Sequence, residues 1–144
     1  MGYRSDVYMC ITGPKDTILA GVATLRIGGD QVMHAALDEW NVVESARPDC
    51  AVMVLGGKGT NLKWYEDFPD VRAHNTIFEH FAELSEDDEH LHGIFLRIGE
   101  DDDDVESREF NEGYELGRVV RDIVRAYDGS GTDLRPRLAS PSQV

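Results

Sequence analysis

In the stretch His92-Gly-Ile-Phe-Leu-Arg-Ile-Gly-Glu-Asp-Asp-Asp-Asp-Val-Glu106, an apolar run is followed at once by four consecutive aspartates. Residues 92–98 have the length and apolar content that are typical of a buried strand. The aspartates indicate a turn, and residues 105–110 are expected to return as an antiparallel strand. The stretch therefore predicts a β-hairpin whose turn carries a concentrated negative charge.

The N-terminal part of the chain predicts a strand and then a helix. Residues 3–12 alternate and are rich in β-forming side chains, and Gly13-Pro14 closes the strand. Asp16 or Thr17 is expected to cap the helix that follows, which should end at Gly28-Gly29.

The next segment predicts a second helix and a hairpin. Asp30 is expected to cap a helix whose apolar face extends to Trp40. Residues 50–55 predict a strand, and residues 62–65 are expected to be its hairpin partner. The intervening Gly-Gly-Lys-Gly-Thr at 56–60 lacks the spacing of a phosphate-binding loop, so we interpret it as a turn.

Residues 69–84 predict the clearest helix, because apolar residues recur there at three- and four-residue steps. Residues 114–127 are ambiguous between helix and strand, and a strand is slightly favoured. Together these elements predict an α+β fold, a mostly antiparallel sheet with helices packed on one face. We expect residues 1–127 to form one compact domain and residues 128–144 to form a flexible C-terminal tail.

The sequence shows no pattern of a membrane span or a signal peptide, and it suggests a structural role for the two cysteines. The 144 residues contain no apolar run of 18 or more, and the N-terminus lacks the basic-then-apolar order of a signal peptide. Cys10 and Cys50 lie beside apolar runs without metal-ligand spacing, so we interpret them as small core residues.

The net charge of −14 narrows the range of partners. Affinity for phosphate groups depends on Lys and Arg, so the sequence argues against direct binding of duplex DNA or an anionic membrane. The charge is unevenly distributed, because eleven acids and the single basic residue Arg97 lie between Glu83 and Glu106, histidines aside. This distribution favours a basic protein partner, although a solvated acidic turn is the simpler interpretation.

Two groups of residues are candidates for a contact surface, and we expect the acids to gather at one end of the sheet. The first group is the acidic runs, and the second combines aromatic and acidic side chains, since Trp and Tyr are enriched in interface hot spots. The predicted partner-binding residues are Glu86, Asp87, Asp88, Glu89, Glu100, Asp101, Asp102, Asp103, Asp104, Glu106, Trp64, Tyr65, Glu66 and Asp67. A core position with a solvated rim is the alternative interpretation for the aromatic group.

Evidence for catalysis is weak. Clustered carboxylates can bind Mg²⁺ or Ca²⁺, but the run 100–104 lacks EF-hand spacing. His90 and His92 would share one face of a strand, yet a third ligand is not identifiable. No nucleophile-elbow, zincin or dinucleotide-binding motif is present. The sequence therefore predicts no cofactor, no metal site and no catalytic residues.

Three motifs carry a family resemblance: Gly2-Tyr-Arg-Ser-Asp-Val7, Leu62-Lys-Trp-Tyr-Glu-Asp67 and Arg97-Ile-Gly-Glu-Asp-Asp-Asp-Asp-Val-Glu106. In these motifs the chain resembles small, uncharacterised accessory proteins of tailed bacteriophages. The resemblance implies expression in the cytoplasm of a bacterial host, and it implies no catalytic residues. By analogy, phage genes of this size commonly encode proteins that bind and disable or redirect a host factor, including defence systems.

These observations lead to three hypotheses of different classes. The first is an acidic binding protein that inhibits a host protein, such as a nucleic-acid-binding CRISPR effector, because patterned carboxylates imitate the field of phosphates. The second is a metal-dependent enzyme or small-ligand binder that uses the acids with His90 and His92. The third is a structural or self-assembling phage component. Self-association as a homodimer is compatible with each of them.

Overall fold

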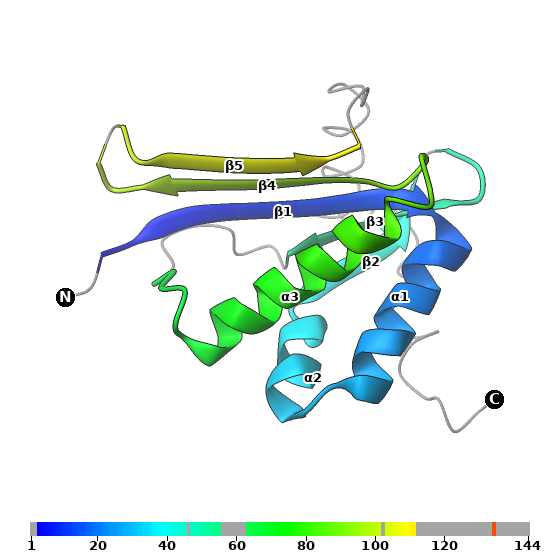
Figure 1. The fold of residues 1–144 in the computed structure, drawn as a ribbon, viewed down its shortest axis with the longest axis horizontal. Coiled ribbons are helices and arrows are strands. Elements are labelled where there is room, and N and C mark those ends of the chain that lie inside the picture. The colour runs from blue at the N-terminus through cyan, green and yellow to red at the C-terminus, as the bar shows by residue number, and fades with distance from the viewer. Residues whose placement is uncertain (1–2, 46, 56–62, 102, 112–133, 135–144) are drawn as a thin grey trace.

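The computed structural model describes residues 3–45, 47–55, 63–101, 103–111 and 134 (Figure 1). These residues form five strands and three helices. In chain order the elements are β1 (Ser5–Pro14), α1 (Lys15–Gly28), α2 (Gln31–Asp38), β2 (Trp40–Glu44), β3 (Cys50–Leu55), α3 (Pro69–Leu84), β4 (His92–Gly99) and β5 (Val105–Phe110).

The described strands form one sheet in the order β2-β3-β1-β4-β5, and every neighbouring pair is antiparallel. β1 and β2 are parallel, are connected through α1 and α2, and have β3 between them. β3 and β4 are likewise parallel, are connected through α3, and have β1 between them. The sheet therefore consists of two interleaved split βαβ units with β5 added at one edge. Right-handed crossovers of this kind place both helical connections on the same face. Figure 1 shows all three helices on that face, which confirms the predicted α+β class.

The main core lies between the sheet and the helices. Alternate residues of β1, including Val7 and Ile11, face the helices and are fully buried, as the two-residue period of a strand requires. Ile77 and Phe81 of α3 pack on them, and Phe95 of β4 extends the same cluster. The helical layer is therefore fixed to the middle of the sheet by apolar contact.

The opposite face of the sheet has a smaller cluster, formed by Cys10, Val43, Val52 and Val54. β3 is buried on both faces, which explains why its sequence is a continuous apolar run instead of an alternating one. Neither cysteine is in a disulfide; Cys10 is buried as predicted, whereas Cys50 is half-buried.

Helix boundaries were predicted better than helix caps. α3 begins and ends at the predicted residues, and Asp30 caps α2 by accepting a hydrogen bond from the Met33 amide at 2.9 Å. The predicted cap of α1 is wrong, because Pro14 occupies that position and no side chain caps the helix. Proline there fixes the backbone entering the helix, Asp16 and Thr17 lie within the first turn, and the Lys15 amide donates to the Asp49 carbonyl at 2.8 Å.

The strand β2 was not predicted. Trp40 begins β2 and does not end the preceding helix, and β2 pairs with β3 along Trp40↔Leu55 to Glu44↔Ala51. The predicted pairing of residues 62–65 with β3 is therefore wrong, because β3 already has β1 on one side and β2 on the other. Residues 63–65 are not part of a strand, and residue 62 lies outside the described residues.

Several predictions concern residues that the structure does not describe. They are the glycine-rich turn at 56–60, the helix or strand at 114–127, and the tail at 128–144 apart from Leu134. Leu134 itself is buried in the main core, and its amide donates a hydrogen bond to the Val42 carbonyl at 2.6 Å. This residue is thus fixed against β2, at one edge of the described sheet.

Candidate functional site

The two acidic runs lie at opposite ends of β4. Residues 86–89 follow α3 and precede the start of β4 at His92, whereas residues 100–104 follow its end at Gly99 (Figure 1). The eight residues of β4 span roughly 25 Å at the usual rise of a strand. The expectation that both runs gather at one end of the sheet is therefore wrong, because a strand carries its two flanking turns apart.

Arg97 holds the acidic turn after β4. Its guanidinium contacts both carboxylate oxygens of Asp104, at 2.7 and 3.1 Å, and Glu106 at 3.1 Å, and it also donates to Ser5 at 3.2 Å. The hydrogen bonds from Arg97, followed by that from Tyr3, lower the pKa of Asp104 to about 2. Asp104 and Glu106 thus stabilise the hairpin and are already engaged within the fold.

The N-terminal residues close over the same turn. The Tyr3 hydroxyl donates to Asp104 at 2.6 Å and accepts from the Asp101 amide at 3.1 Å, and the Arg4 amide donates to Glu100 at 2.7 Å. Within the described part of this turn, Asp101 and Asp103 have exposed side chains, and residue 102 lies outside the described residues. The turn is therefore mainly a structural junction between the N-terminus and the hairpin.

The other acidic run is more open. Asp88 accepts from the His90 amide at 3.0 Å and from the Thr17 hydroxyl at 3.3 Å, so it shapes the turn and connects it to α1. The remaining three acids, Glu86, Asp87 and Glu89, are exposed. Their carboxylates extend the negative charge of the molecule beyond the C-terminal end of α3.

The aromatic residues of the second predicted group are held within the fold. Trp64 stacks on His74, with ring centroids 6.0 Å apart and planes 19° apart, and packs against the main core. The Tyr65 hydroxyl accepts from the Tyr3 amide at 2.6 Å. Their neighbours Glu66 and Asp67 are exposed. Partner binding at this segment stays a prediction, and its exposed part is acidic.

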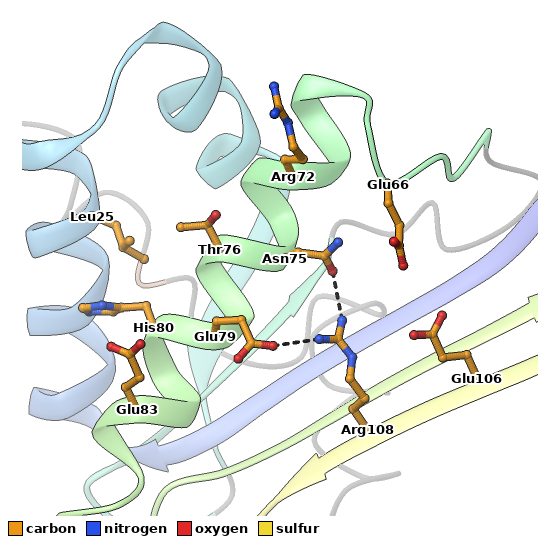
Figure 2. A pocket seen from close by; sticks show the side chains of 10 residues that line it. All are labelled: Leu25, Glu66, Arg72, Asn75, Thr76, Glu79, His80, Glu83, Glu106 and Arg108. Carbon is orange, nitrogen blue, oxygen red and sulfur yellow. Dashed lines mark hydrogen bonds and ion pairs between the residues drawn. The ribbon is translucent and has the colours of Figure 1, made fainter.

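A groove of about 570 Å³ runs between α3 and β5 (Figure 2). Its lining combines one apolar residue with charged and polar side chains from four parts of the chain. The lining residues are Leu25, Glu66, Arg72, Asn75, Thr76, Glu79, His80, Glu83, Glu106 and Arg108. Figure 2 shows Glu66 and Glu106 toward one end of this α3–β5 groove and His80 with Glu83 toward the other.

Arg108 forms the centre of the α3–β5 groove. Its guanidinium lies 4.5 Å from the ring centroid of Phe95 and donates to Glu79 at 2.7 Å and to Asn75 at 3.0 Å. An arginine stacked on an aromatic ring and paired with a carboxylate is fixed in position. Its charge is matched by Glu79, as that of Arg97 is shared by Asp104 and Glu106.

Two acids of the groove remain available for a ligand. Glu66 and Glu83 are exposed, and neither forms an ion pair with another described residue. Sequence reasoning missed the groove because its lining residues come from segments far apart in the chain, between Leu25 and Arg108. The available signal was the polar stripe of α3 opposite its apolar stripe, which a helical wheel shows without indicating what faces it.

The histidine pair does not match its predicted arrangement. β4 begins at His92, so His90 lies in the preceding turn and the two rings do not share one strand face. His92 Nδ1 is 2.6 Å from the Asn111 carbonyl oxygen. Among the residues described, no group of three His, Cys, Asp or Glu side chains is placed to hold a metal ion.

A buried polar relay links α3 to the start of β2. The Trp40 indole donates to His74 Nδ1 at 3.0 Å, so the ring proton of neutral His74 lies on Nε2, 2.8 Å from a Glu39 oxygen. Burial lowers the pKa of His74 below its usual value, against the opposing effects of Glu39 and Asp70. His74 is buried on the apolar face of α3, whose three- and four-residue period the sequence shows, but its partners cannot be identified from sequence.

Comparisons with known proteins leave the family open. No family model, no curated protein and no solved structure matches the chain. The resemblance to phage accessory proteins therefore stays a prediction. Of the helices in the described residues, none has the length and apolar content needed to cross a membrane.

Proposed function

We propose that this protein is a non-enzymatic binding protein that docks on a basic surface of another protein through the α3–β5 groove. The observation that carries the proposal is a pair of exposed carboxylates, Glu66 and Glu83, which form no ion pair with another described residue. They lie at the two ends of a groove whose central arginine, Arg108, is already paired with Glu79. A net charge of −14 adds long-range attraction toward a basic surface and accelerates encounter.

The groove also extends between the two acidic runs, which lie at opposite ends of β4. Glu106 and Glu66 mark the end near the β4–β5 turn, and Glu83 marks the end near residues 86–89. A partner lying along α3 would meet carboxylates at both ends of the groove, with Arg72 between them as a lining cation that forms no ion pair with another described residue. This spaced negative charge resembles in sign the phosphate backbone for which nucleic-acid-binding proteins are built.

The phage resemblance supplies the finer form of the proposal. In that form the partner is a bacterial host protein with a basic surface, in the cytoplasm, and binding inhibits or redirects it. A host defence or nucleic-acid-binding factor, as in an anti-CRISPR or DNA-mimic protein, fits the charge. Direct binding of nucleic acid or membrane is disfavoured by the same charge.

Charge reversal on opposite faces of the sheet tests the proposal. Glu66→Lys and Glu83→Lys each place a positive charge in the groove, whereas Glu109→Lys makes the same change on β5, where alternation points the side chain to the helix-free face. The three tagged variants and the original protein are used to capture partners from bacterial lysate, with quantitative mass spectrometry at low and high salt.

We expect a salt-sensitive partner that Glu109→Lys retains and that each groove variant captures about threefold to tenfold less, because a rim charge contributes roughly 1 kcal/mol. Reversal of Asp104 is unsuitable as a test, because it would disrupt the Arg97 contacts that shape the turn. Equal capture by all four proteins would reject the groove as the interface.

A further inference from the structure

A second hollow, separate from the α3–β5 groove, lies between α2 and the first turn of α3. Its volume of about 420 Å³ is within the range of small-ligand sites. The lining comes from one side of α2, from Glu39 that follows it, and from the first two residues of α3. The lining residues are Gln31, Val32, Ala35, Ala36, Glu39, Pro69 and Asp70.

The chemistry of this α2–α3 hollow is that of an apolar wall with a negative rim. Val32, Ala35 and Pro69 offer aliphatic surface, and Val32 is 40% exposed despite being a large hydrophobic residue. Glu39 and Asp70 are the charged residues of the lining, and no basic side chain of the lining balances them. An aliphatic stem that ends in a cation would match both features.

Both carboxylates are oriented by the protein. One Glu39 oxygen is held by the Nε2–H of His74 at 2.8 Å, and one Asp70 oxygen accepts from the Val71 amide at 2.9 Å. Burial lowers the pKa of His74, which favours the neutral ring, so the ring adds no positive charge beside Glu39. Among the described residues, the second oxygen of each carboxylate has no hydrogen-bond donor, which leaves one oxygen on each for a ligand.

We propose that the α2–α3 hollow binds the side chain of an arginine of the partner protein. This inference rests on the proposed function and identifies one residue type that the partner presents. A planar guanidinium can donate to two separate carboxylates at once, which the compact ammonium of lysine does less well. The aliphatic part of arginine would lie on Val32, Ala35 and Pro69.

The probe for this site is N-acetyl-arginine amide, compared with its citrulline and lysine counterparts. Citrulline keeps the shape of the stem and removes the charge. Binding is followed by ¹⁵N–¹H NMR at the amides of Val32, Ala35 and Ala36 and at the His74 ring. We expect millimolar binding of the arginine probe, as for a single side chain, and about tenfold weaker binding of each counterpart.

Isosteric variants test whether Glu39 and Asp70 are the residues that bind the arginine probe. Glu39→Gln and Asp70→Asn remove charge and preserve an oxygen for the His74 and Val71 hydrogen bonds, and each should weaken the arginine probe about tenfold. Asp38→Asn makes the same change one residue away, where the side chain faces Arg26 at 2.9 Å, and should leave binding unchanged. Equal binding of the three probes, or equal weakening by all three variants, would overturn the inference.

Failure of this inference can be distinguished from failure of the proposed function. If the arginine probe does not bind while lysate capture still depends on Glu83, only the inference about the hollow is refuted. If the probe binds at Glu39 and capture depends on neither Glu66 nor Glu83, the docking surface proposed above is refuted instead.

Discussion

Replacing Trp40 with Phe should expose the energetic importance of the buried relay with His74. Trp40 is fully buried and donates the hydrogen bond that Nδ1 of His74 accepts. In Trp40→Phe that buried acceptor loses its donor, which costs about 1–3 kcal/mol. The smaller ring adds a cavity cost of about 1–2 kcal/mol. We therefore expect the free energy of unfolding to fall by about 2–5 kcal/mol.

A double-mutant cycle separates the hydrogen bond from the cavity. His74→Phe removes the acceptor, so adding Trp40→Phe to it should cost mainly the cavity term. Coupling between the two sites should then be about 1–3 kcal/mol, measured by urea denaturation at pH 7.5. Additive effects of the two substitutions would show that the indole and imidazole do not depend on each other.

The same relay predicts a specific pH dependence. The pKa of folded His74 is lowered below 6.5, so the unfolded chain binds the proton more readily. Stability from this group is therefore present above pH 6.5 and is lost as the pH falls toward the folded pKa, by up to about 1.4 kcal/mol per pH unit. His74→Phe should lack this slope between pH 7.5 and 5. A His74 ring that titrates at or above 6.5 by NMR would refute the reasoning.

Three further substitutions test other parts of the structure. Arg97→Met should destabilise the protein by about 1–3 kcal/mol. Carboxyl NMR should show the pKa of Asp104 rising from about 2 to its ordinary range or higher. The variant should then lack the loss of stability that Asp104 causes in the original protein as the pH falls from 4 to 2. Gly93→Ala should cost about 1–3 kcal/mol in urea denaturation, because a Cβ there would overlap the Phe110 ring. Leu134→Ala should cost about 2–5 kcal/mol in the same assay if its burial contributes to the core, and an unchanged midpoint would contradict that.

Local pattern was sufficient for some elements. α3 and the hairpin of β4 and β5 were predicted because each is continuous in sequence. The helix shows a period of 3.6 residues, and the hairpin shows an apolar run followed by a charged turn. Hydrophobic periodicity did not predict β2, because its sequence Trp-Asn-Val-Val-Glu is too short to display a period. Its extended conformation depends on pairing with β3, which only the assembled sheet supplies.

The candidate site shows the same limit. Sequence alone identified where the acids are, but judged them to be one surface because they lie close along the chain. In the structure Asp104 and Glu106 are engaged by Arg97. Glu66 and Glu83, which form no ion pair with another described residue, border a groove instead. Burial and pairing decide which carboxylates are available, and neither can be read from composition.

The sequence by itself determined the α+β class, the negative charge and the position of the longest helix, because these depend on composition and on periodicity within one segment. Only the tertiary structure decided that the two acidic runs are separated by β4, that His74 meets Trp40 and Glu39, and that α3 and β5 enclose a groove. The physical reason is that crossover connections and strand register bring together residues that are distant in the chain. Conversely, the extended eight-residue strand β4 separates in space two acidic runs that are close in the chain.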